Sequence, residues 1–123
     1  MFDNKMIVPD SLENVEEGFA FQARLPYYRG LGLSMVEDLA VTIDGEAVPR
    51  EAVLLELRGR RWTLEEMEME YGDRWNFGEK ARVIVCREAP LTTGKHHIEL
   101  AERLRISYLP MVPTTRDAKN LTI

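Results

Sequence analysis

The feature that most constrains the fold is a two-residue alternation of apolar and polar side chains that recurs along the chain. It is clearest over residues 97–108, whose apolar members share one face: Ile98, Leu100, Leu104, Ile106 and Tyr108. Because successive side chains of a β-strand point to opposite faces, this period predicts a half-buried strand. Glu102 is the only break in the apolar face, and we expect a bulge or a buried ion pair there.

Other segments carry the same kind of signal. Alternation continues over residues 19–25, 38–43 and 53–57, and the apolar run 82–86 indicates a strand covered on both faces. Asp44-Gly45-Glu46 supplies a hairpin turn, and Gly59 indicates a second turn. Several short strands with frequent turns and no repeating βα alternation predict an all-β protein, an antiparallel β-sandwich.

One short helix interrupts the strands. Thr63-Leu64-Glu65-Glu66 has the pattern of a capping box, in which the Thr63 hydroxyl and the Glu66 carboxylate each accept a backbone amide of the other residue. Leu64, Met67 and Tyr71 follow at helical spacing on one stripe, and Gly72 predicts the end of the helix.

The chain is long enough, at 123 residues, to bury one core without metals or disulfides. We expect a single sandwich domain over residues 1–109. The remaining residues, 110–123, contain two prolines and mostly polar side chains, so we expect an extended C-terminal tail.

Charge and cysteine content narrow the classes of partner and compartment. Sixteen basic and 21 acidic residues give a net charge of −5, which argues against nucleic acid or an anionic membrane surface as the partner. The single cysteine, Cys86, excludes an internal disulfide and is typical of a small buried residue in its apolar run. The chain shows no signal peptide pattern and no apolar run of membrane-spanning length, so we expect a cytoplasmic protein.

No group of residues has the pattern of a catalytic or metal site. Adjacent strand residues face opposite sides, so His96 and His97 could share an ion only from a loop, and we expect instead an exposed turn that enters a strand after Gly94-Lys95. The acidic stretch 65–70 is typical of a solvated helix face. Neither a G-x-S-x-G turn nor a phosphate-binding loop is present. We therefore expect neither catalytic residues nor metal ligands on this chain.

Two loops instead have the composition of a binding surface. The first follows a strand as Arg24-Leu25-Pro26-Tyr27-Tyr28-Arg29-Gly30-Leu31, and the second spans residues 71–79. Tyrosine, tryptophan and arginine dominate interface hot spots. The predicted partner interface comprises Tyr27, Tyr28, Arg29, Leu31, Asp73, Arg74, Trp75 and Phe77. For Trp75 a local minicore, with Phe77 folded back and Asp73 paired to Arg74, is an equally good interpretation.

These segments together resemble a known family, the small β subunit of bacterial C-glycoside deglycosidases. The resemblance is carried by R-x-P-Y-Y-R-G-L-x-L-S at 24–34, V-E-D-L-x-V-T-I-D-G-E-x-V-P at 36–49, W-T-L-E-E-M at 62–67, D-R-W-x-F-G-E at 73–79 and I-S-Y-x-P at 106–110. These strings cover most of the chain in order, and none is a common generic motif.

The resemblance implies one subunit of a heteromeric carbon–carbon lyase. In that family a TIM-barrel α subunit holds a divalent metal, usually manganese, and the complex cleaves 3-keto C-glycosides of aromatic aglycones such as flavonoids by elimination. The β subunit is a β-sandwich without metal ligands or a cofactor of its own. It is expected to stabilise the barrel and shape the mouth of its active site within a higher hetero-oligomer.

Two other functions fit the same residues. A stand-alone carbohydrate-binding module would use exposed tyrosine and tryptophan rings to stack on sugars and would bind a free glycoside by itself. A self-contained small enzyme would have to act through Arg29, Asp73 or His97, and the purified chain would then be active alone.

Overall fold

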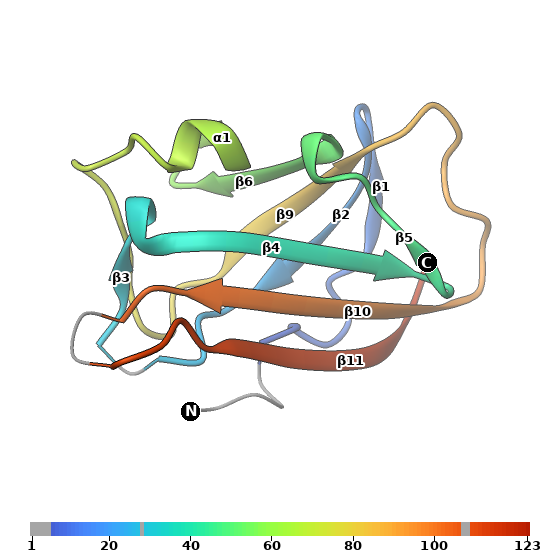
Figure 1. Cartoon of the computed structure of the whole chain (residues 1–123). Helices are drawn as coiled ribbons and strands as arrows, with labels where there is room; N and C mark the ends of the chain where they lie inside the picture. Colours follow the sequence, from blue (N-terminus) through green and yellow to red (C-terminus); the bar gives the residue numbers. More distant parts are fainter. Residues whose placement is uncertain (1–5, 28, 107–108) are drawn as a thin grey trace.

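The alternating segments form strands that lie in two facing antiparallel sheets (Figure 1). The structure, a computed structural model, describes residues 6–27, 29–106 and 109–123. A third, two-stranded sheet closes one end of the sandwich. The predicted all-β class with antiparallel sheets and one short α-helix is confirmed.

The first sheet has β9 at its centre. Its strands, in spatial order, are β1 (Glu13–Val15), β2 (Gly18–Ala23), β9 (Ala81–Cys86), β6 (Val53–Leu57) and β7 (Arg60–Thr63). Val83, Ile84 and Val85 are all buried, as expected for a strand covered on both faces. Cys86, expected to be buried, is instead exposed because it ends the strand where the chain leaves the core.

The second sheet corrects the expected domain boundary. Its strands, in spatial order, are β11 (Thr114–Thr122), β10 (Lys95–Leu104), β4 (Val36–Ile43) and β5 (Glu46–Ala47). The segment 110–123 was expected to be a tail outside the domain, but β11 pairs with β10 along its whole length. The sandwich therefore extends to residue 122, with β11 along the front lower edge in Figure 1.

Both predicted turns are confirmed. Asp44 and Gly45 have φ values of 50° and 82°, and Arg58 and Gly59 have values of 51° and 81°. Two successive left-handed residues between paired strands make the tight turn that suits the twist of a hairpin. The second turn leaves Arg58 at the tip of the β6–β7 hairpin.

The α-helix begins as predicted but ends early. The helix α1 (Leu64–Met67) has both hydrogen bonds of the capping box, from the Glu66 amide to Thr63 Oγ1 at 3.0 Å and from the Thr63 amide to Glu66 Oε1 at 2.8 Å. After Met67 the chain continues in i→i+3 hydrogen bonds instead of helical ones. Tyr71, expected on the buried stripe, is consequently exposed.

Two 3₁₀ turns, η2 (Leu33–Met35) and η3 (Arg50–Ala52), precede β4 and β6. None of the helices in the described residues is long and apolar enough to cross a membrane.

Glu102 is fully buried on the inner face of β10. A bulge is present next to it, where the β10–β4 register shifts between Arg103 and Leu104. The alternative, a buried ion pair, is not found, since within the described residues neither carboxylate oxygen of Glu102 has a hydrogen-bond partner. Burial, together with the nearby charge of Asp117, raises the pKa of Glu102 well above its ordinary value.

The two histidines lie on opposite faces of β10 and not in the exposed turn that was expected. His96 is buried and His97 is exposed, and within the described residues no group of three or more His, Cys, Asp or Glu side chains is placed to hold a metal ion. His96 Nδ1 lies 2.7 Å from Asp44 Oδ2 and His96 Nε2 lies 2.7 Å from the Thr92 carbonyl. Both neighbours are acceptors, and these contacts raise the pKa of His96, which favours the protonated imidazolium.

Candidate partner interface

The two loops singled out in the sequence meet in the smallest sheet. In it, β3 (Leu31–Gly32) pairs with β8 (Arg74–Trp75), with Leu31 opposite Trp75. The pairing is extended by a hydrogen bond from the Leu33 amide to the Asp73 carbonyl at 3.0 Å and by one from Arg74 Nη2 to the Arg29 carbonyl at 3.2 Å. The loops are therefore one structural unit at the end of the sandwich.

Several side chains expected at the interface lie in the core instead. Tyr27, Leu31 and Trp75 are buried by the chain itself. The Trp75 indole donates to the Glu79 carbonyl at 2.9 Å, which satisfies its only polar atom. The minicore interpretation is thus correct for Trp75, and a partner cannot be what buries these three side chains. Tyr28 lies outside the described residues.

The remaining predicted residues divide by exposure. Arg29, Arg74 and Phe77 are exposed, and Asp73 is half-buried. The minicore interpretation expected Asp73 to pair with Arg74, but its carboxylate pairs with Arg58 and Arg60 instead. The exposed part of the predicted interface is therefore basic and aromatic. Asp73, its acidic residue, instead holds the loop in place through its two ion pairs.

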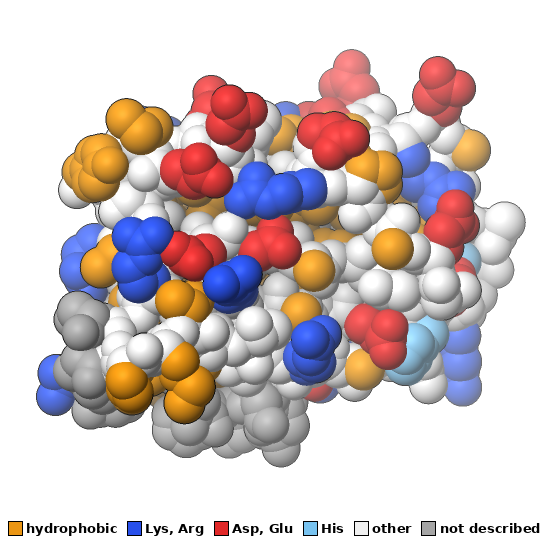
Figure 2. Space-filling model, viewed as in Figure 1, with side chains coloured by type: hydrophobic (Ala, Val, Ile, Leu, Met, Phe, Trp, Pro, Cys, Tyr) orange, Lys and Arg blue, Asp and Glu red, His pale blue; other side chains and the backbone are white. Residues whose placement is uncertain are grey.

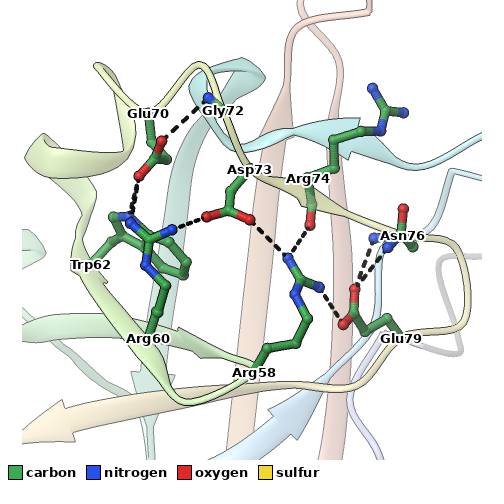
Figure 3. A network of polar contacts seen from close by, with 9 residues as sticks. All are labelled: Arg58, Arg60, Trp62, Glu70, Gly72, Asp73, Arg74, Asn76 and Glu79. Atoms are coloured by element: carbon green, nitrogen blue, oxygen red, sulfur yellow. Dashed lines mark hydrogen bonds and ion pairs between the residues drawn. The ribbon is translucent and has the colours of Figure 1, made fainter.

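Arg58 is the centre of the polar network that holds this loop in place (Figure 3). Its guanidinium binds Asp73 Oδ1 at 3.3 Å, the Arg74 carbonyl at 2.8 Å and the Glu79 carboxylate. Glu79 Oε1 accepts the Asn76 amide at 3.2 Å. One side chain from the β6–β7 turn thus fixes the loop on both sides of β8.

Arg60 extends the network toward the start of the loop. It pairs with Asp73 and with Glu70, and its guanidinium carbon lies 4.9 Å from the centre of the Trp62 ring. Hydrogen bonds to Glu70 from the Trp62 indole, at 3.0 Å, and from the Gly72 amide, at 3.2 Å, lower the pKa of its carboxyl. The loop is consequently preorganised in the isolated chain.

A groove lies beside this loop. It consists of two depressions of about 520 and 250 Å³ that share Met35 and Arg105 as lining residues. We call them together the arginine groove, after the four arginines that line it: Arg29, Arg74, Arg103 and Arg105. Its floor comes from η2 with the adjoining start of β4 and from the end of β10, so two regions far apart in sequence build it.

Exposed hydrophobic side chains surround the same end of the molecule. Among the described residues the large hydrophobic side chains that are exposed are Met69 at 72%, Tyr71 at 76%, Phe77 at 52% and Met111 at 68%. The segments that carry them all lie at the left end in Figure 1. In the same view, Figure 2 shows hydrophobic side chains at the upper and lower left with charged ones between them. Such a mixture is typical of a protein interface.

Sequence reasoning missed part of this surface. Arg103 and Arg105 were assigned only to the polar face of the last predicted strand, and Tyr71 to a buried helix stripe. The available signal was the alternation itself, which places Arg103 and Arg105 on one outward face next to the I-S-Y-x-P motif at 106–110.

Comparison with known proteins gives a consistent result. The family model described as C-glycoside deglycosidase beta subunit matches residues 2–108. The chain is 37% identical over 111 residues to a 3'-dehydrocarminate deglycosidase beta subunit from Microbacterium sp, covering 90% of this chain and 83% of the relative. It is 29% identical over 111 residues to a C-glycoside deglycosidase beta subunit from Arthrobacter globiformis, covering 89% and 84%.

Proposed function

This chain belongs to the C-glycoside deglycosidase beta subunit family, and we propose that it acts by docking onto a catalytic α subunit through the end that carries the arginine groove. The observation that carries the proposal is the gathering, at that end, of the exposed large hydrophobic side chains of the described residues. Exposed apolar side chains that gather at one end of a small domain, with charged ones between them, are typical of a protein–protein contact.

Membership of the family supports a proposal for the chemistry of the complex. We propose a TIM-barrel α subunit that carries a divalent metal, manganese in the usual case, and a 3-keto C-glycoside as substrate. A base removes the acidic proton next to the ketone, and the aromatic aglycone then leaves with a proton on its ring carbon. The Microbacterium relative is named for a 3'-dehydro substrate, which supports an oxidised sugar as the form that is cleaved.

The role of this chain in that complex is structural. Its preorganised loop and groove would cover part of the barrel and shape the mouth of the active site, while catalytic groups and the metal belong to the α subunit. Rigid presentation of the loop by Arg58 and Arg60 supports this role, because an ordered docking surface loses little entropy on binding.

Coexpression tests the proposal. The chain expressed with its α subunit is expected to copurify as a hetero-oligomer that converts a 3-keto C-glycoside, whereas the chain alone is expected to self-associate through its exposed apolar end. A monodisperse monomer without affinity for the α subunit would overturn the proposal.

Carbohydrate binding by the isolated chain is the weaker alternative. The structure buries Trp75 and Tyr27, two of the rings on which that hypothesis relied, and leaves Tyr71 exposed beside the groove. Calorimetry of the chain alone with a C-glycoside decides between the two, since the subunit role predicts no heat of binding.

A further inference from the structure

The arginine groove carries more cationic than anionic groups. Arg103 and Arg105 both pair with one carboxylate, that of Glu37, with Arg103 Nε 3.7 Å from Glu37 Oε1. Glu68, the other acidic residue of the groove, lies 3.5 Å from Arg50. The groove therefore keeps a positive charge although the whole chain has a net charge of −5.

Arg74 adds to this charge. Within the described residues it forms no ion pair, and its guanidinium donates only to the Arg29 carbonyl, at 3.2 Å. Figure 3 shows its side chain directed away from the carboxylates of the Arg58 network, which its own backbone carbonyl joins. The network thus uses the main chain of Arg74 and leaves the guanidinium to the groove.

From this arrangement we propose that the arginine groove receives a carboxylate-bearing segment of the α subunit, an inference that rests on the proposed docking function. An arginine fork binds a carboxylate through two parallel hydrogen bonds, which gives the contact direction as well as strength. Arg74, which forms no ion pair within the described residues, and Arg103, whose contact with Glu37 is long at 3.7 Å, are the residues most available to make it, since Glu37 holds Arg105 more closely.

The surroundings favour a protein segment over a small anion. Met69, Tyr71 and Met111 are exposed at the same end of the molecule. In a complex these side chains would cover the arginines and exclude water, and an ion pair shielded in this way contributes more than one in solvent. Carboxylates on the partner would also match the positive groove and favour one docking orientation.

The first test is the affinity of the α subunit for charge-neutral variants. Arg74→Gln keeps a donor for the Arg29 carbonyl but removes the charge, and Arg103→Gln removes the weaker partner of Glu37. We expect each to weaken binding roughly 10-fold, and the double variant to bind with a shallower dependence on NaCl concentration, because fewer charges are neutralised.

Arg87→Gln is the matched control. Arg87 is exposed on the loop that joins β9 to β10, at the opposite end of the sandwich, and pairs with no carboxylate within the described residues. Its variant is expected to bind with unchanged affinity and salt dependence.

The second test identifies the partner group. Arg74→Lys retains the charge but loses the fork, so we expect it to bind more tightly than Arg74→Gln and less tightly than the wild type. In the assembled complex a water-soluble carbodiimide should then join that amine to a partner Asp or Glu by an amide bond. Mass spectrometry of the crosslinked peptides locates the bond, and Arg87→Lys should give no such product.

The outcomes separate the inference from the function on which it rests. If the wild-type chain does not bind the α subunit, both fail. If it binds, but the double variant keeps full affinity and salt dependence, the groove inference alone is wrong. Full affinity combined with a raised KM for the glycoside would assign the groove to an anionic substrate instead and would likewise overturn it.

Discussion

Leu31 lies directly opposite Trp75 in the sheet formed by β3 and β8, so the two motifs richest in aromatic residues form one unit. Both side chains are buried, and Trp75 is among the largest fully buried residues of the protein. The pair closes the end of the core, and exposed neighbours such as Arg74 and Phe77 are presented on top of it. The interface therefore depends on buried residues that cannot themselves touch a partner.

A comparison of Trp75→Ala with Phe77→Ala distinguishes residues that stabilise the fold from residues that contact the partner. Removal of a fully buried tryptophan is expected to lower the free energy of unfolding by about 3–5 kcal/mol, measured by urea denaturation. Phe77→Ala, at an exposed neighbour, is expected to cost less than about 1 kcal/mol and yet to weaken binding of the α subunit. A large loss of stability in the Phe77 variant would show that this ring is also part of the core.

Gly30 is needed where the two motifs approach each other most closely. Its φ is +68°, and a Cβ added there would lie 2.7 Å from the Trp75 carbonyl oxygen, a backbone atom that cannot move aside easily. Gly78 has a similar φ of +80° but open space around it. Both alanine variants pay the left-handed strain of about 1–2 kcal/mol, and Gly30→Ala is expected to lose distinctly more in thermal unfolding. Equal losses would contradict a steric role for Gly30.

Local patterns in the sequence were sufficient to predict most of the fold. The turns at Asp44-Gly45 and Arg58-Gly59 and the capping box at Thr63 depend on neighbouring residues only, and all three are present. Strand β11 was missed because polar side chains such as Asp117 and Lys119 face inward at the sheet edge, so its sequence shows no apolar period.

The candidate site was harder to predict because its residues meet only through tertiary structure. An aromatic loop in the sequence looks the same whether a ring faces solvent or the core, and the burial of Trp75 depends on its pairing with the distant Leu31. Arg103 and Arg105 form a groove only together with η2 and Arg74, which the fold places beside them. Periodicity indicates which face a side chain occupies but not what lies beside that face.

Arg58→Ala is expected to loosen the docking loop. It removes the contacts to Asp73, Glu79 and the Arg74 carbonyl, so amide exchange over residues 73–79 should accelerate and affinity for the α subunit should fall. Arg61→Ala is the matched control, because Arg61 also pairs with two carboxylates and the two side chains are 43% and 44% exposed. If both variants behave alike, Arg58 acts through general stability and not through the loop.

His96 should make stability depend on pH near neutrality. Its pKa is raised by the hydrogen bond to Asp44 and then by that to the Thr92 carbonyl, relative to an ordinary value of 6.5. A raised histidine pKa stabilises the fold fully below about 6.5, and the contribution is lost as the pH rises through the folded-state pKa. The wild-type melting temperature should therefore fall above pH 6.5 more steeply than that of His96→Gln. Parallel curves for the two proteins would show that the ring is not charged in the fold.

Glu102 should make the free energy of unfolding fall as the pH rises, which is opposite to the effect of a paired carboxylate. Its pKa is raised by burial and then by the charge of Asp117, so above the ordinary value of 4.5 the folded state keeps a proton that the unfolded state releases. The folded state binds more protons, and stability therefore falls as pH rises from 4.5 toward the folded-state pKa. Glu102→Leu, which removes an unpartnered buried polar group, is expected to raise the free energy of unfolding at pH 7 by about 1–3 kcal/mol.

Glu102→Gln separates the effect of the titrating proton on stability from the effect of side-chain packing. The amide has nearly the shape of the protonated acid and the same lack of partners, but it does not titrate, so its advantage over wild type should grow as the pH rises from 4.5 toward the folded-state pKa and vanish below 4.5. Urea unfolding of the three proteins across that range measures both effects. If wild type and Glu102→Gln keep a constant difference, the carboxyl is ionised in the fold, and a cation or a hydrogen-bond donor must lie beside it.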